Sequence, residues 1–336
     1  MSVVAVPEQA KSSGGVDEPP FYRWLLGKIA PLLGLAAVYA FFAVAKPGAF
    51  MTLPNSKLIL EEMALNGLAA LGTTLVIISG GIDLSIGPVV ALCSVVVALL
   101  ILHGWPIILA VFAAVATGAL CGALNGLIIT AFNLLPFIVT LGAWSALRGA
   151  AQGLCHSQSV NANAGWLANL LNTPSGNWKW LPLPLGVWLI FIVTAALWAL
   201  LRYTRFGRHV FAIGSNEQTA RLCGVRVRTS KIWVYAIASA MAGLAGVMNF
   251  AWMSGVGKST LSYITLPAIA SVVVGGASLS GGEGSPVGTL IGVLIIAIVS
   301  NGCGVMDLSN WVQKVVTGAI IIVAVALDRL RRRRAR

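Results

Sequence analysis

The chain has 336 residues, of which 58% are apolar and 10% are charged. A water-soluble domain has about 25% charged residues, so this composition excludes a soluble globular protein. The net charge of +12 could indicate a nucleic-acid partner, but the Lys and Arg residues lie between apolar segments rather than on a soluble basic face. We therefore expect a membrane-embedded chain that binds no nucleic acid.

Residues 1–22 are polar and lack the apolar core of a cleavable signal peptide. We expect them to form a disordered cytoplasmic lead-in, followed by a transmembrane domain over 23–328 and a basic cytoplasmic tail over 329–336. The five cysteines form no Cys-x-x-Cys pair, so neither a disulfide framework nor a metal site is expected.

Apolar runs of roughly 20 residues can cross a membrane as helices. The sequence predicts six such segments before the main basic loop and four after it. The expected fold is therefore an all-α polytopic membrane protein with about ten transmembrane helices, although the eighth segment is short for a crossing. The predicted segments are 29–45, 58–79, 86–102, 105–132, 136–154, 183–201, 232–253, 267–279, 285–302 and 311–327.

Positive charge concentrates in residues 202–231, with seven Lys and Arg, and in residues 328–336, with six Arg. The positive-inside rule places both regions in the cytoplasm, which requires an even number of crossings between them. The four predicted segments satisfy this requirement. The six earlier segments then place the N-terminus in the cytoplasm as well.

The pattern Gly-Gly-x-x-Leu-Ser occurs twice, and each copy interrupts an apolar stretch. Glycine-interrupted segments in both halves of a chain indicate a transport pathway, because an unwound backbone needs protein or a water-filled cavity around it. Alternatively, both copies are tight turns, with Asp83 or Ser85 capping the following helix. The candidate pathway or gate residues are Gly80, Gly81, Asp83, Ser85, Gly275, Gly276, Ser278 and Ser280.

Asp83 is the only acidic residue from Met63 to Leu147. A carboxylate at membrane depth is costly, so Asp83 has either a functional role or the role of a helix cap. Other polar residues inside the predicted spans either line a solute path or form interhelical hydrogen bonds. They include Asn66, Asn125, Thr140, Asn249 and Asn301.

The basic loop 202–231 is predicted to contain a short helix. Ser215 or Asn216 can cap it, Glu217 lies in its first turn, and Gly224 suits the left-handed position that ends it. A helix of about two turns is marginal in water. It therefore needs a docking partner or, alternatively, an anionic lipid surface for Arg221 and its basic neighbours.

Together these motifs resemble the permease subunit of bacterial ABC importers for monosaccharides of the ribose, xylose, arabinose and galactoside type. The resemblance covers roughly residues 50–332. It rests on residues 80–87, 136–142 with Arg148 and Gly149, 207–224, 275–282 and 326–330.

The resemblance implies that Glu217, Ala220, Arg221 and Gly224 belong to a coupling helix that fits a separate ATPase. ATP and Mg would bind that partner, so no catalytic residue or cofactor is expected in this chain. The other implied partners are an extracytoplasmic solute-binding protein and a second permease copy, as homodimer or heterodimer, in the bacterial inner membrane. Thr265 and Pro267 replace two carboxylates common in the family, so the substrate could differ.

A rival interpretation is a self-sufficient secondary transporter or channel for a small polar solute. Such a protein needs a coupling carboxylate or a filter inside the membrane, and Asp83 is the strong candidate for either. A membrane-anchored enzyme would need a catalytic set that the sequence does not present. The expected function is therefore ATP-driven import of a monosaccharide or a similar small polar solute.

Overall fold

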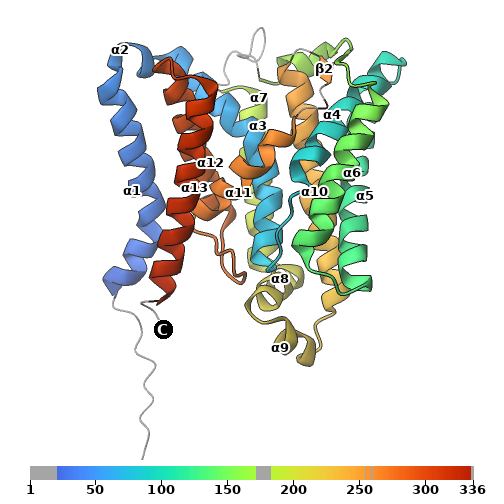
Figure 1. The fold of residues 1–336 in the computed structure, drawn as a ribbon, viewed down its shortest axis with the longest axis vertical. Coiled ribbons are helices and arrows are strands. Elements are labelled where there is room, and N and C mark those ends of the chain that lie inside the picture. The colour runs from blue at the N-terminus through green and yellow to red at the C-terminus, as the bar shows by residue number, and fades with distance from the viewer. Residues whose placement is uncertain (1–20, 172–182, 254, 258, 260, 334–336) are drawn as a thin grey trace, which may run out of the picture.

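The computed structural model describes residues 21–171, 183–253, 255–257, 259 and 261–333. Long helices stand side by side and make up most of the molecule (Figure 1). Residues 1–20 of the expected lead-in lie outside the described residues. The described strands, β1 (Val160–Asn161) and β2 (Val256–Gly257), form one antiparallel pair in which Val160 lies opposite Gly257.

Helices account for both halves of the chain. The first half contains α1 (Phe21–Ala45), α2 (Pro47–Phe50), α3 (Leu53–Ile78), α4 (Ile86–Leu102), α5 (Ile107–Ala131), α6 (Pro136–Leu154) and the 3-10 turn η1 (Gly165–Asn169). The second half contains α7 (Leu185–Tyr203), α8 (Arg205–Ser215), α9 (Glu217–Leu222), α10 (Val227–Trp252), η3 (Leu261–Ile264), α11 (Thr265–Val274), α12 (Pro286–Val305) and α13 (Asn310–Arg333).

Each apolar segment predicted from the sequence overlaps one of these helices. Five described helices, α3, α5, α7, α10 and α12, are long and apolar enough to cross a membrane. The total of about ten crossings stays a prediction. Two details differ from expectation: α13 continues to Arg333, into the predicted tail, and both glycine pairs lie in connections between helices rather than inside one.

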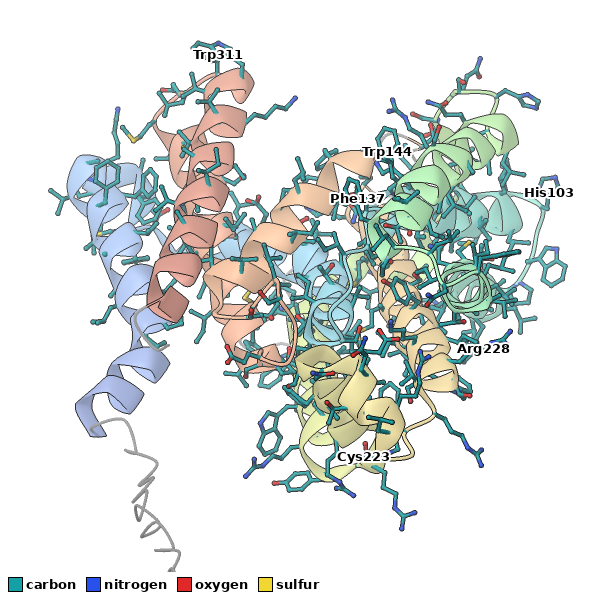
Figure 2. All side chains as sticks on the ribbon, turned by 60° about the horizontal axis from the view of Figure 1, so that its bottom comes forward. His103, Phe137, Trp144, Cys223, Arg228 and Trp311 are labelled. Carbon is teal, nitrogen blue, oxygen red and sulfur yellow. The ribbon has the colours of Figure 1, made fainter. Side chains whose placement is uncertain are left out.

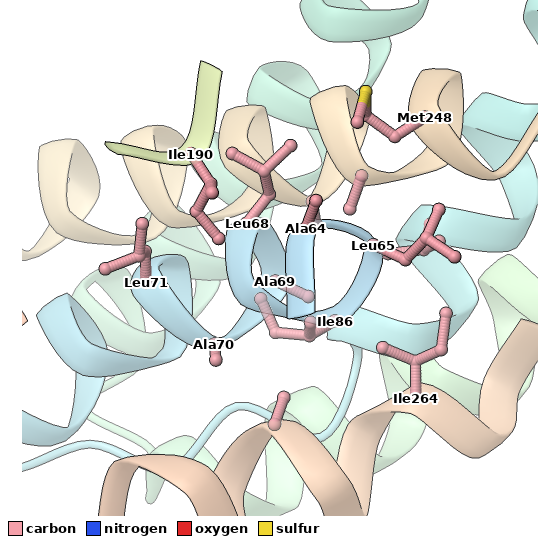
Figure 3. Packing of buried hydrophobic residues seen from close by; sticks show 14 of the residues in the cluster. Ala64, Leu65, Leu68, Ala69, Ala70, Leu71, Ile86, Ile190, Met248 and Ile264 are labelled. Atoms are coloured by element: carbon pink, nitrogen blue, oxygen red, sulfur yellow. The ribbon is translucent and has the colours of Figure 1, made fainter. Parts of the chain in front are cut away.

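The centre of the bundle is formed by α3 and α10. In the most apolar 18 residues of each, 83% and 78% are buried, against 22% in α5. Small residues such as Ala64 allow this packing, and Figure 3 shows the side chains of α3 meeting Ile190 of α7 and Met248 of α10. The apolar residues on the outer face of α5 are what a lipid environment requires.

The contact between α5 and α10 depends on glycine. A Cβ atom at Gly122 would lie 2.6 Å from the Ser239 hydroxyl and even closer to the carbonyl oxygen of Tyr235. Gly118 and Gly126 meet the α10 backbone in the same way. Glycine at this spacing lets two helix backbones approach closely in a membrane.

One end of the molecule gathers three parts of the chain. The start of α1, the end of α13 and the pair α8–α9 all lie there, whereas α2 and the β1–β2 pair lie at the opposite end (Figure 1). The short helices α8 and α9 project beyond the long helices at this end (Figure 1).

Candidate functional site

The helix predicted in the basic loop is confirmed as α9. The side chain of Asn216 caps it by accepting a hydrogen bond from the amide of Thr219 at 2.9 Å. Gly224, just beyond its end, has a φ of +82°, the left-handed conformation that glycine adopts at low cost. The helix α8 before it was not predicted, although Thr204 caps it by accepting from the amide of Gly207.

The outer surface of α9 is exposed and partly apolar. Leu222, at its end, is 88% exposed. Cys223 follows it and is the one exposed cysteine of the five; Figure 2 shows it at the outer end of α9. On the inner side, Ala220 is buried against Ile213 and Val227 in a small cluster separate from the main core.

Glu217 of α9 forms an ion pair with α10. Its Oε2 atom accepts a hydrogen bond from Lys231 Nζ at 2.6 Å, and its Oε1 atom pairs with Arg221 at 3.2 Å. The Lys231 side chain is 15% exposed, whereas that of Arg221 is 67% exposed. The pair with Lys231 is therefore the stronger of the two, because exposed pairs are screened by water. The sequence analysis did not assign this role to Lys231.

The last turn of α8 packs directly on both glycine segments. A Cβ atom at Gly214 would overlap the carbonyl oxygen of Ile78 and lie 2.5 Å from the amide of Gly282. That amide already donates a hydrogen bond to the same Ile78 oxygen at 2.9 Å. Gly281 in turn approaches the backbone of Gly80, since its Cβ atom would be 2.7 Å from Gly80 Cα. We call this contact of α8 with residues 78–81 and 280–282 the glycine junction.

In each glycine pair one residue provides the turn and the other provides room. Gly80 and Gly276 have φ values of +81° and +91°. A Cβ atom at Gly81 would lie 2.5 Å from the Tyr235 hydroxyl, and one at Gly275 would meet the backbone of Gly288. This geometry is that of turns between helices, the second of the two interpretations of the sequence pattern.

Asp83 is fully buried and forms a turn with Ser85, the residue just before α4, while its Oδ2 atom has no hydrogen-bond partner among the described residues. Its Oδ1 atom accepts hydrogen bonds from the amide of Ser85 at 2.8 Å and from its hydroxyl at 2.6 Å. The Ser85 hydroxyl accepts from Asn125 Nδ2 at 2.9 Å. Thr140 donates to the carbonyl of Ile82 at 3.1 Å. Asn125 and Thr140, two candidate solute-lining residues, thus hold the first glycine segment by interhelical hydrogen bonds.

We expect Asp83→Asn to fold and transport much as the wild type, because the amide oxygen can still accept from Ser85. Asp83→Ala leaves both Ser85 donors without an acceptor and should lower the free energy of unfolding by about 1–3 kcal/mol. Thermal unfolding in detergent and solute uptake measure the two effects. Normal folding of Asp83→Asn with loss of uptake would show instead that the carboxylate charge acts in a pathway.

The second glycine segment is anchored by serine and threonine. Ser278 is buried, and its hydroxyl accepts from the amide of the exposed Ser280 at 3.1 Å. Thr265, at the start of α11, accepts from the amide of Gly87 at 3.1 Å and donates to the carbonyl of Leu84 at 3.3 Å. Thr265 therefore connects α11 to the beginning of α4.

The remaining candidate lining residues lie away from the glycine junction. Asn249 is buried and donates to the carbonyl of Ala245 within α10 at 3.0 Å. Asn66 and Asn301 are partly exposed, on α3 and α12. The sequence analysis did not single out Glu61 and Glu62 of α3, which the rule on acidic residues inside predicted spans would have found.

Comparison with known proteins agrees with this architecture. Residues 58–325 match the family described as the branched-chain amino acid transport system permease component. The ribose import permease protein RbsC of Escherichia coli (strain K12) is 37% identical over 309 residues, covering 91% of this chain and 94% of that protein. No solved structure matches the chain.

Two further relatives cover similar lengths. RbsC of Bacillus subtilis (strain 168) is 38% identical over 305 residues, 91% of this chain and 94% of that protein. The D-allose transport system permease protein AlsC of Escherichia coli (strain K12) is 33% identical over 323 residues, 96% and 98% of the two chains. The chain therefore belongs to this family and is a multi-pass permease subunit of ABC import systems.

Proposed function

We propose that this chain carries a monosaccharide into the cytoplasm and that α9 couples it to a separate ATPase, which binds ATP and Mg. The names of two relatives, a ribose import permease and a D-allose transport permease, support a monosaccharide as the transported solute. Their nearly full-length matches also disfavour the rival interpretation of a self-sufficient transporter or channel.

The single observation that carries the coupling role is the construction of α9. It is capped at Asn216, ended at Gly224 and fastened by Glu217, yet it exposes Leu222 and Arg221 at the outer end of the molecule. Leu222 offers a partner an apolar contact, and Arg221 beside it offers a charged one. Ala220 fills the inner side, so α9 can press on α8 as a unit.

The glycine junction gives the proposed coupling a physical route. When the ATPase pair closes on ATP, α9 moves, and α8 moves with it. Because Gly214 is in backbone contact with Ile78 and Gly282, the ends of α3 and the α11–α12 connection have to follow. Alternation between outward-facing and inward-facing states would arise from this linked movement.

The proposed assembly contains two permease copies, identical or different, an ATPase pair and an extracytoplasmic solute-binding protein. The orientation follows from the positive charge of the α7–α10 connection, which favours the cytoplasm. The start of α1 and the end of α13 lie at the same end of the molecule as α8 and α9 (Figure 1), which supports cytoplasmic N- and C-termini.

Purification of the tagged chain from its native membranes in mild detergent tests this proposal. We expect a stoichiometric ATPase to co-purify with the wild type. Leu222→Asp should remove the ATPase, because a carboxylate replaces the apolar contact. Met51→Asp is the matched control, since Met51 is 60% exposed beside α2 at the opposite end. An intact preparation that repeatedly contains no ATPase would contradict the coupling role.

A further inference from the structure

An apolar cavity of about 380 Å³ lies between α1, α3 and α12. Nine described residues line it, four from α1, three from α3 and two from α12, and we call it the α1 cavity. Apart from Tyr39 and Ser56, their side chains are pure hydrocarbon. A sugar would find almost no hydrogen-bond partner on these walls. The α1 cavity is therefore unsuited to the polar solute that the permease transports.

The α1 cavity is open at the side of the molecule. Its inner wall includes Ile59 and Ile298, which are buried. Its outer wall is α1, whose Leu32 and Tyr39 are 48% and 38% exposed. This helix stands at one edge of the bundle, beside α12 (Figure 1). Because residues 31–45 of α1 are apolar, the opening faces the hydrocarbon of the bilayer rather than water.

Three aromatic rings attach α1 to the bundle at the α2 end. Phe42 packs on Gly302 of α12, where a Cβ atom would lie 2.5 Å from the ring. The ring of Phe50 in α2 lies 5.6 Å from that of Phe42 and 5.3 Å from that of Tyr39. Since Tyr39 also lines the α1 cavity, the cavity begins directly at this aromatic cluster.

The depth of the α1 cavity matches one leaflet of a bilayer. Its lining residues in α1 extend from Tyr39 to Leu32, about 10 to 21 Å along the helix from Lys46. One leaflet with its headgroup layer is about 20–22 Å thick. If Lys46 lies at the membrane surface, the α1 cavity therefore lies at the depth of the acyl chains of the leaflet on the α2 side.

Positive charge lies on the headgroup side of the α1 cavity. Lys46 is exposed and joins α1 to α2. Its carbonyl oxygen accepts a hydrogen bond from the amide of Phe50 at 2.9 Å, and the Phe50 ring contacts Tyr39. Residues 21–60 contain no Asp or Glu that would repel a phosphate. A Lys side chain at a membrane surface attracts an anionic headgroup.

We infer that an anionic glycerophospholipid binds here, with one acyl chain in the α1 cavity and its phosphate beside Lys46. The acyl chain packs against these walls as another helix would, because both are apolar. The lipid then joins α1 to α3 and α12 below the aromatic cluster. The inference depends on the membrane location alone, so its failure leaves the proposed function untouched.

Photo-cross-linking in vesicles tests the lipid site. The full-length chain is placed in phosphatidylethanolamine and phosphatidylglycerol vesicles containing a phosphatidylglycerol with a diazirine on its acyl chain, and mass spectrometry locates the adducts. Phe112 and Leu120, exposed on α5, report contact with bulk lipid. We expect more adducts on residues 32–39 and 56–60 than on α5. Equal numbers would indicate bulk lipid and fewer a covering protein, and either result would overturn the site.

Two substitutions in α1 distinguish the α1 cavity from the outer side of the helix. Ala36 and Ala37 are both exposed, but only Ala36 lines the cavity. Ala36→Trp should lose the adducts on residues 56–60, because the indole takes the place of the acyl chain, whereas Ala37→Trp should keep them. Adducts retained by Ala36→Trp would contradict the site. The α5 adducts check insertion, and if Ala36→Trp inserts poorly, the wild-type ratio decides.

Lys46→Gln tests the headgroup contact. It should lower the adducts at the α1 cavity about fivefold, the effect of one Lys on an anionic lipid at a membrane surface. Lys314→Gln is the matched control, since Lys314 is exposed near the start of α13, at the same end of the molecule (Figure 1). An equal signal in the two variants would overturn the assignment of an anionic phospholipid.

Discussion

Gly214→Ala should reduce solute uptake to less than about one tenth of the wild-type rate, the largest effect we expect from a single methyl group in this chain. The new Cβ atom would overlap the carbonyl oxygen of Ile78 and approach the amide of Gly282. Both are backbone atoms and cannot turn away as a side chain would. The end of α8 would have to separate from the glycine junction, and the movement of α9 would no longer reach α3.

The measurement is uptake together with ATPase co-purification. Because α9 itself is unchanged, the ATPase should still bind Gly214→Ala, so coupling fails while assembly persists. Gly304→Ala on α12 is the control, since the space around Gly304 is open for a Cβ atom. If Gly214→Ala transports as well as Gly304→Ala, the glycine junction does not transmit the movement.

Reversing the charges of Glu217 and Lys231 should show whether Glu217 acts within this chain or on its partner. Each single reversal, Glu217→Lys or Lys231→Glu, places like charges side by side and should lower uptake about five- to tenfold, as expected for about 1–1.4 kcal/mol. The double variant restores the attraction and should recover at least about half of the wild-type uptake. Arg228→Glu, an exposed reversal nearby on α10, serves as control.

Low uptake by the double variant would assign Glu217 to the partner instead of to Lys231. If uptake stays as low as in the single variants, the Glu217 carboxylate is needed on the ATPase rather than on Lys231. The 2.6 Å contact between Lys231 Nζ and Glu217 Oε2 favours recovery of uptake in the double variant.

The helices could be predicted from the sequence because each apolar run overlaps one helix. The same holds for α9, whose cap at Asn216 and end at Gly224 are local signals within nine residues. The helix α8 was missed because its segment was interpreted as a loop, although Gly207, Val210 and Ile213, its buried residues, recur three apart as on one face of a helix.

The glycine junction could not be predicted, because it joins residues far apart in the chain. Gly80, Gly214 and Gly282 meet only after α3, α8 and α12 have packed. The repeated glycine pattern indicated two special places but gave no sign that they touch. Likewise, nothing in the sequence showed that Asp83 forms its hydrogen bonds with Ser85, two residues along the chain.

The exposed thiol of Cys223 has a practical consequence. The other four cysteines are buried or half-buried, so a maleimide fluorophore should react selectively at the outer end of α9 without any engineered residue. Its emission would report the arrival and departure of a bound protein in real time.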